Sequence, residues 1–458
     1  MICKRHKDPI ASAIYSLSPF GRICVALCAA VLIHLTIGTY HTFGNMLPYM
    51  ASYMRNNTDR SIRIENMMWI PTFQGCFPFA MVIGGITTNI FSPRTSAFLG
   101  CFLVTSSVAI SGYTIQHSLS LFFISYGLLF GLGMGIAYVT AVTTVINWAP
   151  DKVGVVSGIV AAGFGISSSI FAPIQTWIVN PKNLPATKDG YFVQPELLER
   201  VPHLFRTLAV IYGIMQMVAL VFVCDPPFRK SRSEESLSET EDEDDDDETP
   251  VFNSNEDENL PQMTPSEMLR SSTFYCLFAA LFCCSFYANM FYNLYKTFAE
   301  SFIEDDFFIA MAFSVGSIAN AIARIGWGYL TDRTSFQISL SSATCLATFF
   351  LLTMPSASKL GKYVYLLWLI GTFICMGATH ALFITATVKC FGNRHKANNY
   401  GFLILSTTLS GILLSAVSEF YLKSIGYTYL FITTAAFPFC AFIIISCIQY
   451  TPQGNRVV

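Results

Sequence analysis

Long apolar stretches alternate with short polar ones along the whole chain. Each stretch holds roughly 17–25 residues with few charges, the length that an α-helix needs to cross the hydrocarbon core of a bilayer. The breaks are rich in Arg, Asn, Pro or Lys, as at 55–63, 180–185 and 356–362. The pattern predicts twelve transmembrane helices, at Arg22–Phe43, Met67–Thr88, Thr95–Ile115, Leu119–Trp148, Val153–Val179, Leu204–Cys224, Ser272–Tyr295, Phe307–Leu330, Phe336–Met354, Val364–Val388, Gly401–Leu422 and Tyr427–Ile448.

Composition agrees with a membrane protein. Of the 458 residues 53% are hydrophobic and only 12% are charged, and the formal net charge is −2. A soluble domain carries about twice that share of charged residues, and a nucleic-acid-binding protein carries a basic excess. The sequence contains no phosphate-binding loop, no nucleophile motif and no Cys/His ligand spacing. We therefore predict an all-α membrane protein that is not an enzyme and uses no cofactor or metal.

The two halves of the chain repeat each other. Gly85 and Gly328 each end an apolar stretch and are 243 residues apart, and Gly158 and Gly401 have the same separation. Two pseudo-symmetric six-helix halves around a site near the bilayer midplane are typical of secondary transporters. The domain organisation that we expect is a cytoplasmic N-terminal tail (1–21), an N-terminal half (22–224), a cytoplasmic acidic connector (225–271), a C-terminal half (272–448) and a cytoplasmic tail (449–458).

The connector contains the acidic run Glu241–Glu248, which cannot bury apolar surface. We expect a disordered, solvated tether between the halves. Ser233, Ser236 and Thr240 lie close to acidic residues, so a kinase or a trafficking partner that binds this segment is the alternative.

Charge placement predicts the orientation. The basic start Met1–Lys7 and a modest excess of Lys and Arg on the same side favour cytoplasmic termini. We expect a multi-pass protein, in the plasma membrane, with an outer first loop. That loop holds the glycosylation sequon Asn56-Asn57-Thr58, so Asn56 is a candidate glycosylation site.

A loop after the eighth stretch carries a known signature. Gly328-Tyr329-Leu330-Thr331-Asp332-Arg333 resembles the G-x-L-x-D-R loop of the major facilitator superfamily, and a degraded copy follows the second stretch. The resemblance implies the twelve-helix fold of that family and a role of these loops in cytoplasmic gating. The residues to which it assigns that role are Gly85, Asn89, Arg94, Gly328, Asp332 and Arg333.

Further segments narrow the resemblance to one branch. Gly131–Tyr138, Trp148–Gly154 and Asn398–Gly401 are similar to the oxalate:formate antiporters and the monocarboxylate transporters. That branch carries small organic anions. The resemblance implies that an Arg in span eight binds the substrate carboxylate and that Tyr138 lines the same cavity.

Arg324 is the one full charge that the pattern places deep within a span. It precedes Asp332 by eight residues, roughly 12 Å of helix, and no acid lies in the central third of any predicted span. An unpaired guanidinium in a membrane is costly, and a carboxylate substrate would neutralise it through two parallel hydrogen bonds. The alternative is an Arg satisfied by backbone carbonyls, water and Asn320.

Other polar residues in the spans are candidates for the same cavity, although a lone Tyr or His in a helix is more often packed in the core. We expect Lys296 to be an interfacial anchor at the outer mouth. The candidate substrate-binding residues are Arg324, Tyr138, His380, Tyr40, His41 and Gln74.

Two departures from the branch limit the assignment of the substrate. Thr407 stands near the place where the antiporters have a second cation, so one carboxylate fits better than two. Asn320 stands where proton-coupled monocarboxylate transporters have an Asp, so His34, His41, His380 or Glu419 would have to carry a proton.

We predict a secondary active or facilitative transporter of a small organic anion, a monocarboxylate like lactate or pyruvate. Alternating access would move the substrate, and Arg324 would be its carboxylate anchor. The alternatives are a carrier of another small nutrient such as an amino acid, and a transport-inactive relative that acts as a sensor or scaffold.

Overall fold

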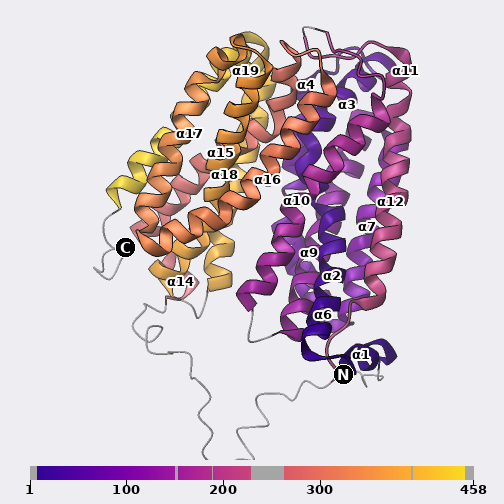
Figure 1. Ribbon diagram of the computed structural model, residues 1–458, viewed down its shortest axis with the longest axis vertical. Coiled ribbons are helices and arrows are strands. Elements are labelled where there is room, and N and C mark those ends of the chain that lie inside the picture. The colour runs from indigo at the N-terminus through magenta and orange to yellow at the C-terminus, as the bar shows by residue number, and fades with distance from the viewer. Residues whose placement is uncertain (1–7, 150–152, 188, 228–262, 393–395, 449–458) are drawn as a thin grey trace, which may run out of the picture.

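The computed structural model describes residues 8–149, 153–187, 189–227, 263–392 and 396–448, and every regular element in these ranges is a helix (Figure 1). The N-terminal half contains α1 (Pro9–Tyr15), α2 (Pro19–Ile37), η1 (Gly38–Thr42), α3 (Phe43–Asn57), α4 (Ile64–Met67), α5 (Trp69–Gln74), α6 (Phe77–Ile90), α7 (Pro93–Thr114), α8 (Leu119–Phe122), η2 (Phe123–Leu129), α9 (Phe130–Trp148), α10 (Val153–Val179), α11 (Pro195–Leu198) and α12 (Arg200–Phe222). The C-terminal half contains α14 (Pro265–Met268), α15 (Ser272–Glu300), α16 (Asp306–Arg333), α17 (Phe336–Lys359), α18 (Lys362–Phe391) and α19 (Lys396–Cys447).

The predicted number of spans is confirmed, because 12 helical segments of the described chain are long and apolar enough to cross a membrane. The largest difference concerns the first span, which continues from Pro19 to Asn57 and so passes the expected end at Phe43. Polar residues such as Asn45 and Ser52 interrupt the apolar pattern there, but they are buried inside the bundle and do not end the helix.

The internal repeat extends to the start of the third membrane-spanning helix of each half. Ser92 lies before α7 and Ser335 lies before α17, and both have the same extended backbone (φ −160° and −162°, ψ 159° in each). The Ser92 hydroxyl accepts a hydrogen bond from the Thr95 amide, and the Ser335 hydroxyl accepts one from the Ile338 amide, 3.1 Å in both cases. A serine cap satisfies an amide that the first helical turn leaves free.

Helix α19 consists of two helices that meet at a kink and hold the last two spans. It turns at Gly426, whose φ of 71° lies in the left-handed region that glycine tolerates best. The kink lies close to the boundary between the eleventh and twelfth spans, Asn399–Leu422 and Ser424–Cys447.

The bundle has two ends that we name by their contents. The connector end holds α1 and α14, and the opposite end holds α4 and α11 (Figure 1). At the connector end Arg94 binds Asp8 with 2.9 Å between Nη1 and Oδ2, and donates to the carbonyls of Leu220 and Val221. These bonds tie the start of α7 to the end of α12 and to the segment that leads into α1, which the sequence had predicted to be a tail.

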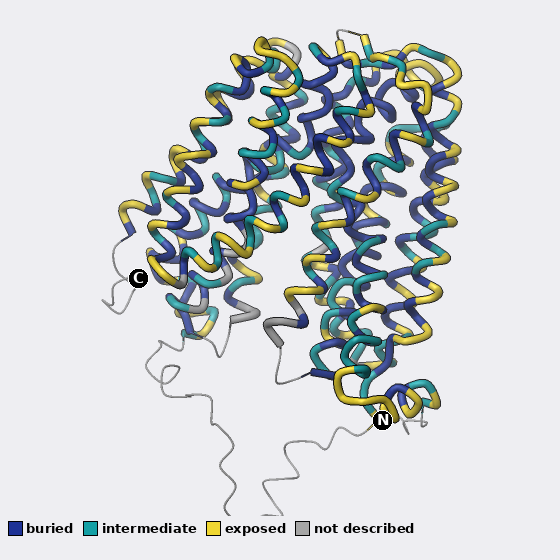
Figure 2. Tube along the Cα trace, viewed as in Figure 1, coloured by how far each residue is buried: buried dark blue, intermediate teal, exposed yellow. Residues whose placement is uncertain are grey.

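The surface of the bundle carries many exposed large apolar side chains. Large side chains such as Phe102, Trp177, Ile325 and Phe420 are well exposed, and exposed positions follow the outer faces of the helices (Figure 2). A soluble protein does not expose apolar area on this scale. We infer that these faces contact lipid.

Contacts between the halves gather towards the opposite end. Trp69 Nε1 of α5 donates to Glu419 Oε2 of α19 at 2.5 Å, and the Thr72 hydroxyl lies 2.6 Å from that of Ser415. Midway along the bundle the Ser168 hydroxyl of α10 donates to Ser317 of α16 at 3.0 Å. The ribbons of the halves diverge towards the connector end (Figure 1).

Gly44 allows a close approach of α3 to α15, which belong to different halves. A Cβ at this position would lie 2.0 Å from the carbonyl oxygen of Tyr292, which is far inside van der Waals contact. We expect Gly44→Ala to keep the halves apart at the opposite end and to increase the labelling rate of a cysteine introduced at Asn293 by a water-soluble maleimide. Gly158→Ala is the matched control, because a Cβ there would meet nothing within 4 Å. Equal labelling rates in both variants would contradict this role of Gly44.

Candidate functional site

Arg324 lies on α16, nine residues before its end at Arg333, with a half-buried side chain. Its Nε donates to Asn320 Oδ1 at 3.1 Å, and Asn320 Nδ2 in turn donates to the carbonyl of Phe373 at 2.7 Å. Among the described residues no carboxylate forms an ion pair with Arg324. The amide of Asn320 therefore orients the guanidinium and leaves its charge without an acidic partner in this part of the chain.

Tyrosines from both halves lie within electrostatic range of this guanidinium. Arg324 acts electrostatically on the hydroxyls of Tyr138 on α9, Tyr292 on α15 and Tyr400 on α19. Tyr138 belongs to the N-terminal half and the other two belong to the C-terminal half. Hydroxyl groups can donate to a carboxylate as well as accept from a guanidinium, so the arrangement suits an anion held between the halves.

An aromatic wall lines the N-terminal side of this region. The ring of Tyr138 lies 4.7 Å from His34 and 5.6 Å from Phe164, measured between ring centroids. His41 stacks on Tyr292 of the other half at 5.1 Å and also packs against Phe164 at 5.1 Å. These rings offer apolar faces beside the charged group, which suits a substrate with a carboxylate and a small apolar body.

The structure places the predicted site residues in different environments. Tyr138 lies within electrostatic range of Arg324, His41 stacks on Tyr292, and Tyr40 packs against His41 with centroids 5.2 Å apart. Gln74 is buried against η2, where its Nε2 donates to the carbonyl of Tyr126 at 2.8 Å. Because a π-helix such as η2 leaves carbonyls outside the regular bonding pattern, Gln74 has a clear packing role. The side chain of His380 lies outside the described part of the structure.

The loop residues of the gating signature are described only in part. The side chains of Asn89 and Asp332 lie outside the described part of the structure, as does the acidic run Glu241–Glu248. Arg333 lies over the ring of Tyr329, 4.8 Å from its centroid. A Cβ at Gly85 or Gly328 would meet nothing within 4 Å, so these glycines are not required by close packing here.

Tyr292, Tyr400 and Phe164 are not among the residues that the sequence predicts for the site. Tyr400 follows Asn399 in a segment that was noted for its resemblance alone, and Tyr292 lies in a run of aromatic residues on α15. Nothing in their spacing separates them from aromatic residues that pack in the core. Only the tertiary structure distinguishes them, because it brings α10 and α15 against α16 and places Tyr400 of α19 within electrostatic range of Arg324.

The expectation for Lys296 as an interfacial anchor is wrong. Its side chain is 0% exposed, and its Nζ lies 2.7 Å from Asp306 Oδ1 and 4.0 Å from Glu300 Oε1. The ammonium also lies over the ring of Tyr49, 4.0 Å from the centroid, and donates to Asn45 Oδ1 at 3.2 Å. Two acids at the ends of neighbouring helices provide partners that the linear pattern does not show, so Lys296 is buried between the halves.

A bundle of twelve spanning helices in two related halves, with a cation between them, defines a membrane transporter. The sequence profile of the Major Facilitator Superfamily matches residues 26–415, with a second match at 277–457. The chain therefore belongs to the Major Facilitator Superfamily. It is a transporter and not an enzyme.

Two proteins are similar to the chain in sequence, and a solved structure is similar to it in fold. The chain is 26% identical to the apicoplast pyruvate carrier 1 of Toxoplasma gondii, over 88% of this chain and 84% of that protein. It is 23% identical to the oxalate:formate antiporter of Oxalobacter formigenes, over 78% and 76% of the two chains. The crystal structure of a D-xylose-proton symporter matches with a TM-score of 0.69 at 10% identity, over 95% of this chain and 99% of that one.

Proposed function

We propose that this transporter carries a small monocarboxylate such as pyruvate or lactate by alternating access, with Arg324 binding the carboxylate. The observation that carries the proposal is the position of Arg324 between the halves, oriented by Asn320 and without a carboxylate partner among the described residues. Relatives named for pyruvate and for oxalate and formate support a carboxylate substrate.

One carboxylate group fits this site better than two. Thr407 stands near the expected second cation of the antiporters, and its hydroxyl donates to the Ile404 carbonyl of its own helix at 2.7 Å. A second carboxylate would therefore meet no matching charge at this position, and the aromatic rings around His41 and Tyr138 favour an apolar group.

We further propose that the connector end faces the cytoplasm and that the protein lies in the plasma membrane. The exposed Asn56 at the end of α3 then lies on the outer side, where its sequon would be open to glycosylation. A kinase or a trafficking adaptor would have access to the acidic connector from the cytoplasm.

Purified transporter in proteoliposomes should show saturable uptake of labelled pyruvate. We expect unlabelled lactate to compete strongly, oxalate weakly and neutral amino acids not at all, because one guanidinium and an apolar wall select for a single carboxylate. Strong competition by an amino acid would favour a nutrient carrier of that kind. Absence of saturable uptake for every compound in the panel would favour a sensor or scaffold.

A further inference from the structure

A buried cluster of three charged residues lies at the opposite end, far from Arg324. Lys296 and Glu300 lie on α15 and Asp306 begins α16, and their side chains are 0%, 2% and 2% exposed. One ammonium thus faces two carboxyl groups. With both carboxyl groups ionised the cluster would carry an uncompensated negative charge inside the protein, which has a large desolvation cost.

The two carboxyl groups differ in how they are satisfied. Asp306 binds Lys296 at 2.7 Å and accepts hydrogen bonds from the Tyr49 hydroxyl and from Asn180 Nδ2. Neither oxygen of Glu300 accepts a hydrogen bond from any described residue, and Lys296 Nζ is 4.0 Å from the nearer one. A proton on Glu300 therefore removes the excess negative charge without breaking any hydrogen bond between described residues, whereas a proton on Asp306 would weaken its bonds to Lys296, Tyr49 and Asn180.

The neighbouring helices bring no second positive charge to Glu300 within the described chain. The titratable groups that act on it are Lys296 and Tyr295 of α15, Asp306 of α16, Tyr49 of α3 and Tyr427 of α19. Glu65 of α4 and Tyr365 of α18 lie one step further away, next to Tyr427 and Tyr295 respectively. All but Lys296 are neutral or acidic, so the charge balance of the cluster depends on a proton.

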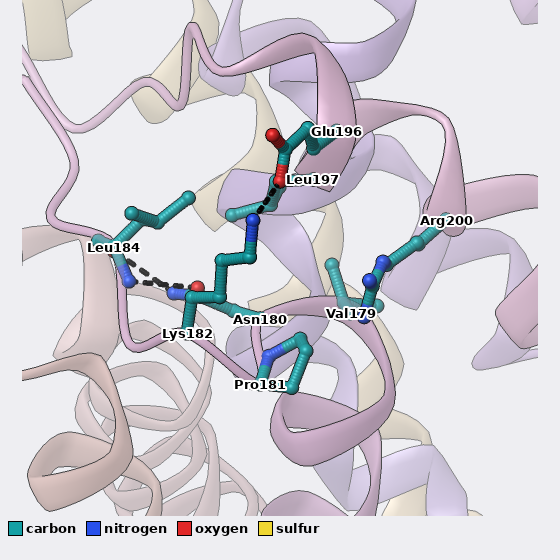
Figure 3. Close-up of a pocket in the computed structure, with 8 residues that line it drawn as sticks. All are labelled: Val179, Asn180, Pro181, Lys182, Leu184, Glu196, Leu197 and Arg200. Carbon is teal, nitrogen blue, oxygen red and sulfur yellow. Dashed lines mark hydrogen bonds and ion pairs between the residues drawn. The ribbon is translucent and has the colours of Figure 1, made fainter.

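The contribution of the N-terminal half to the cluster is neutral. Tyr49, Asn45 and Asn180 are its contacts, and Asn180 is itself fixed by two 2.8 Å hydrogen bonds with the backbone of Leu184 (Figure 3). When the halves part at this end, the charged residues stay together on the C-terminal half. Water then replaces the neutral partners and can solvate an ionised Glu300.

We propose that Glu300 binds a proton when the two halves close at the opposite end and releases it when they part. The contacts between the halves at this end thus form a gate whose closure takes up a proton. The closed state then holds one more proton than the open state. By linkage its population rises as the pH falls, with a limit of about tenfold in the closed-to-open ratio per pH unit. This site acts on the gate, whichever substrate Arg324 binds, so it does not depend on the proposed monocarboxylate.

A distance measurement between the halves tests the proposal without any substrate. Val193 of the N-terminal half and Leu360 of the C-terminal half are exposed at the opposite end. Spin labels at V193C and L360C, in a full-length chain with its native cysteines replaced by Ser, report the closed and open populations in nanodiscs. We expect the wild-type closed fraction to be larger at about pH 5.5 than at about pH 8.5, by the linkage of one proton.

Glu300→Gln should remain mostly closed at both pH values, because a neutral side chain leaves only the Lys296–Asp306 pair. Glu300→Leu is a second neutral variant, for use where Glu300→Gln does not fold. The matched control is Asp305→Asn, which removes a carboxyl group of the same loop that pairs with Lys362 at 3.1 Å and is 36% exposed. This control should keep the wild-type pH response.

Asp305 is a suitable control because it stays ionised over this pH range. Partial burial raises the pKa of its carboxyl group, but hydrogen bonds from Asn183, the Phe308 amide and Lys362 together lower that pKa below its ordinary value. A wild-type closed fraction that does not change with pH would overturn the proposal. So would a Glu300→Gln or Glu300→Leu variant that keeps the wild-type pH response.

Discussion

Arg324→Ala is expected to abolish most carboxylate uptake and to leave the amount of folded protein in the membrane largely unchanged. Two charge-assisted hydrogen bonds to the substrate are lost, each worth roughly 1.5–3 kcal/mol, so uptake should fall by about 10²- to 10⁴-fold. Folding is spared because no described carboxylate pairs with Arg324, and its removal therefore leaves no buried acid without a partner. Uptake of labelled pyruvate, normalised to the surface level, measures the effect.

Arg324→Lys separates a substrate role from a structural one. Lysine keeps the charge but cannot offer the two parallel donors of a guanidinium, so this variant should also reach the membrane and transport poorly. An Arg with a purely structural role predicts the reverse order, with Lys tolerated and Ala harmful through folding. Arg206→Ala is the matched control, since Arg206 is an exposed Arg on the outer face of α12. A folded Arg324→Ala protein with wild-type uptake kinetics would end the anchor hypothesis.

Lys296→Ala is expected to have the largest effect on stability. It removes the only described cation of a buried cluster and leaves Asp306 and Glu300, both 2% exposed, without their partner. Removal of one member of a buried ion pair costs about 3–5 kcal/mol. The variant should therefore show a lower yield of monodisperse protein and a lower unfolding temperature in detergent.

Lys362→Ala is the matched control at the same end of the bundle. Its ion pair with Asp305 is more than a third exposed on both sides, and such surface pairs contribute about 0–1 kcal/mol. Combining Lys296→Met with Glu300→Gln and Asp306→Asn removes the charges together and should recover much of the lost stability. An unfolding temperature of Lys296→Ala equal to that of Lys362→Ala would contradict the buried cluster as a stabilising element.

The spans and the two halves follow from the sequence, because the length of an apolar run is a local property. A helix that crosses the bilayer must satisfy its own backbone and present apolar side chains, and both demands are visible one segment at a time. The repeat is also visible in the sequence, as the 243-residue spacing of Gly85 and Gly328. The matching caps at Ser92 and Ser335 have the same spacing and reflect a structural repeat. Arg324 stands out for a related reason, since a lone charge in an apolar run is rare.

Only the tertiary structure decided which residues share a site with Arg324. Tyr292 and Tyr400 lie in segments that look like ordinary packed helix. Tyr292 of α15 contacts Phe313 of α16, and Tyr400 of α19 lies within electrostatic range of Arg324. Gln74, a candidate for the cavity, also has a partner that the local sequence does not show, because its Nε2 donates to the carbonyl of Tyr126, 52 residues later in the chain. Periodicity assigns a residue to a helix face, whereas the partner of that face depends on contacts far apart in the sequence.

Lys296 is the clearest case of a residue whose environment the local sequence does not determine. A lysine near the end of a span has two stable solutions, the aqueous interface or a buried partner, and the local sequence does not choose between them. The choice depends on Asp306, which begins the next helix, and on Tyr49 and Asn45, which lie some 250 residues earlier in the chain. By itself the sequence determined the spans, the repeat and the rare intramembrane cation, because each rests on the local cost of placing a group in lipid. The tertiary structure decided the partners of each polar group, because that cost is met by residues that only folding brings together.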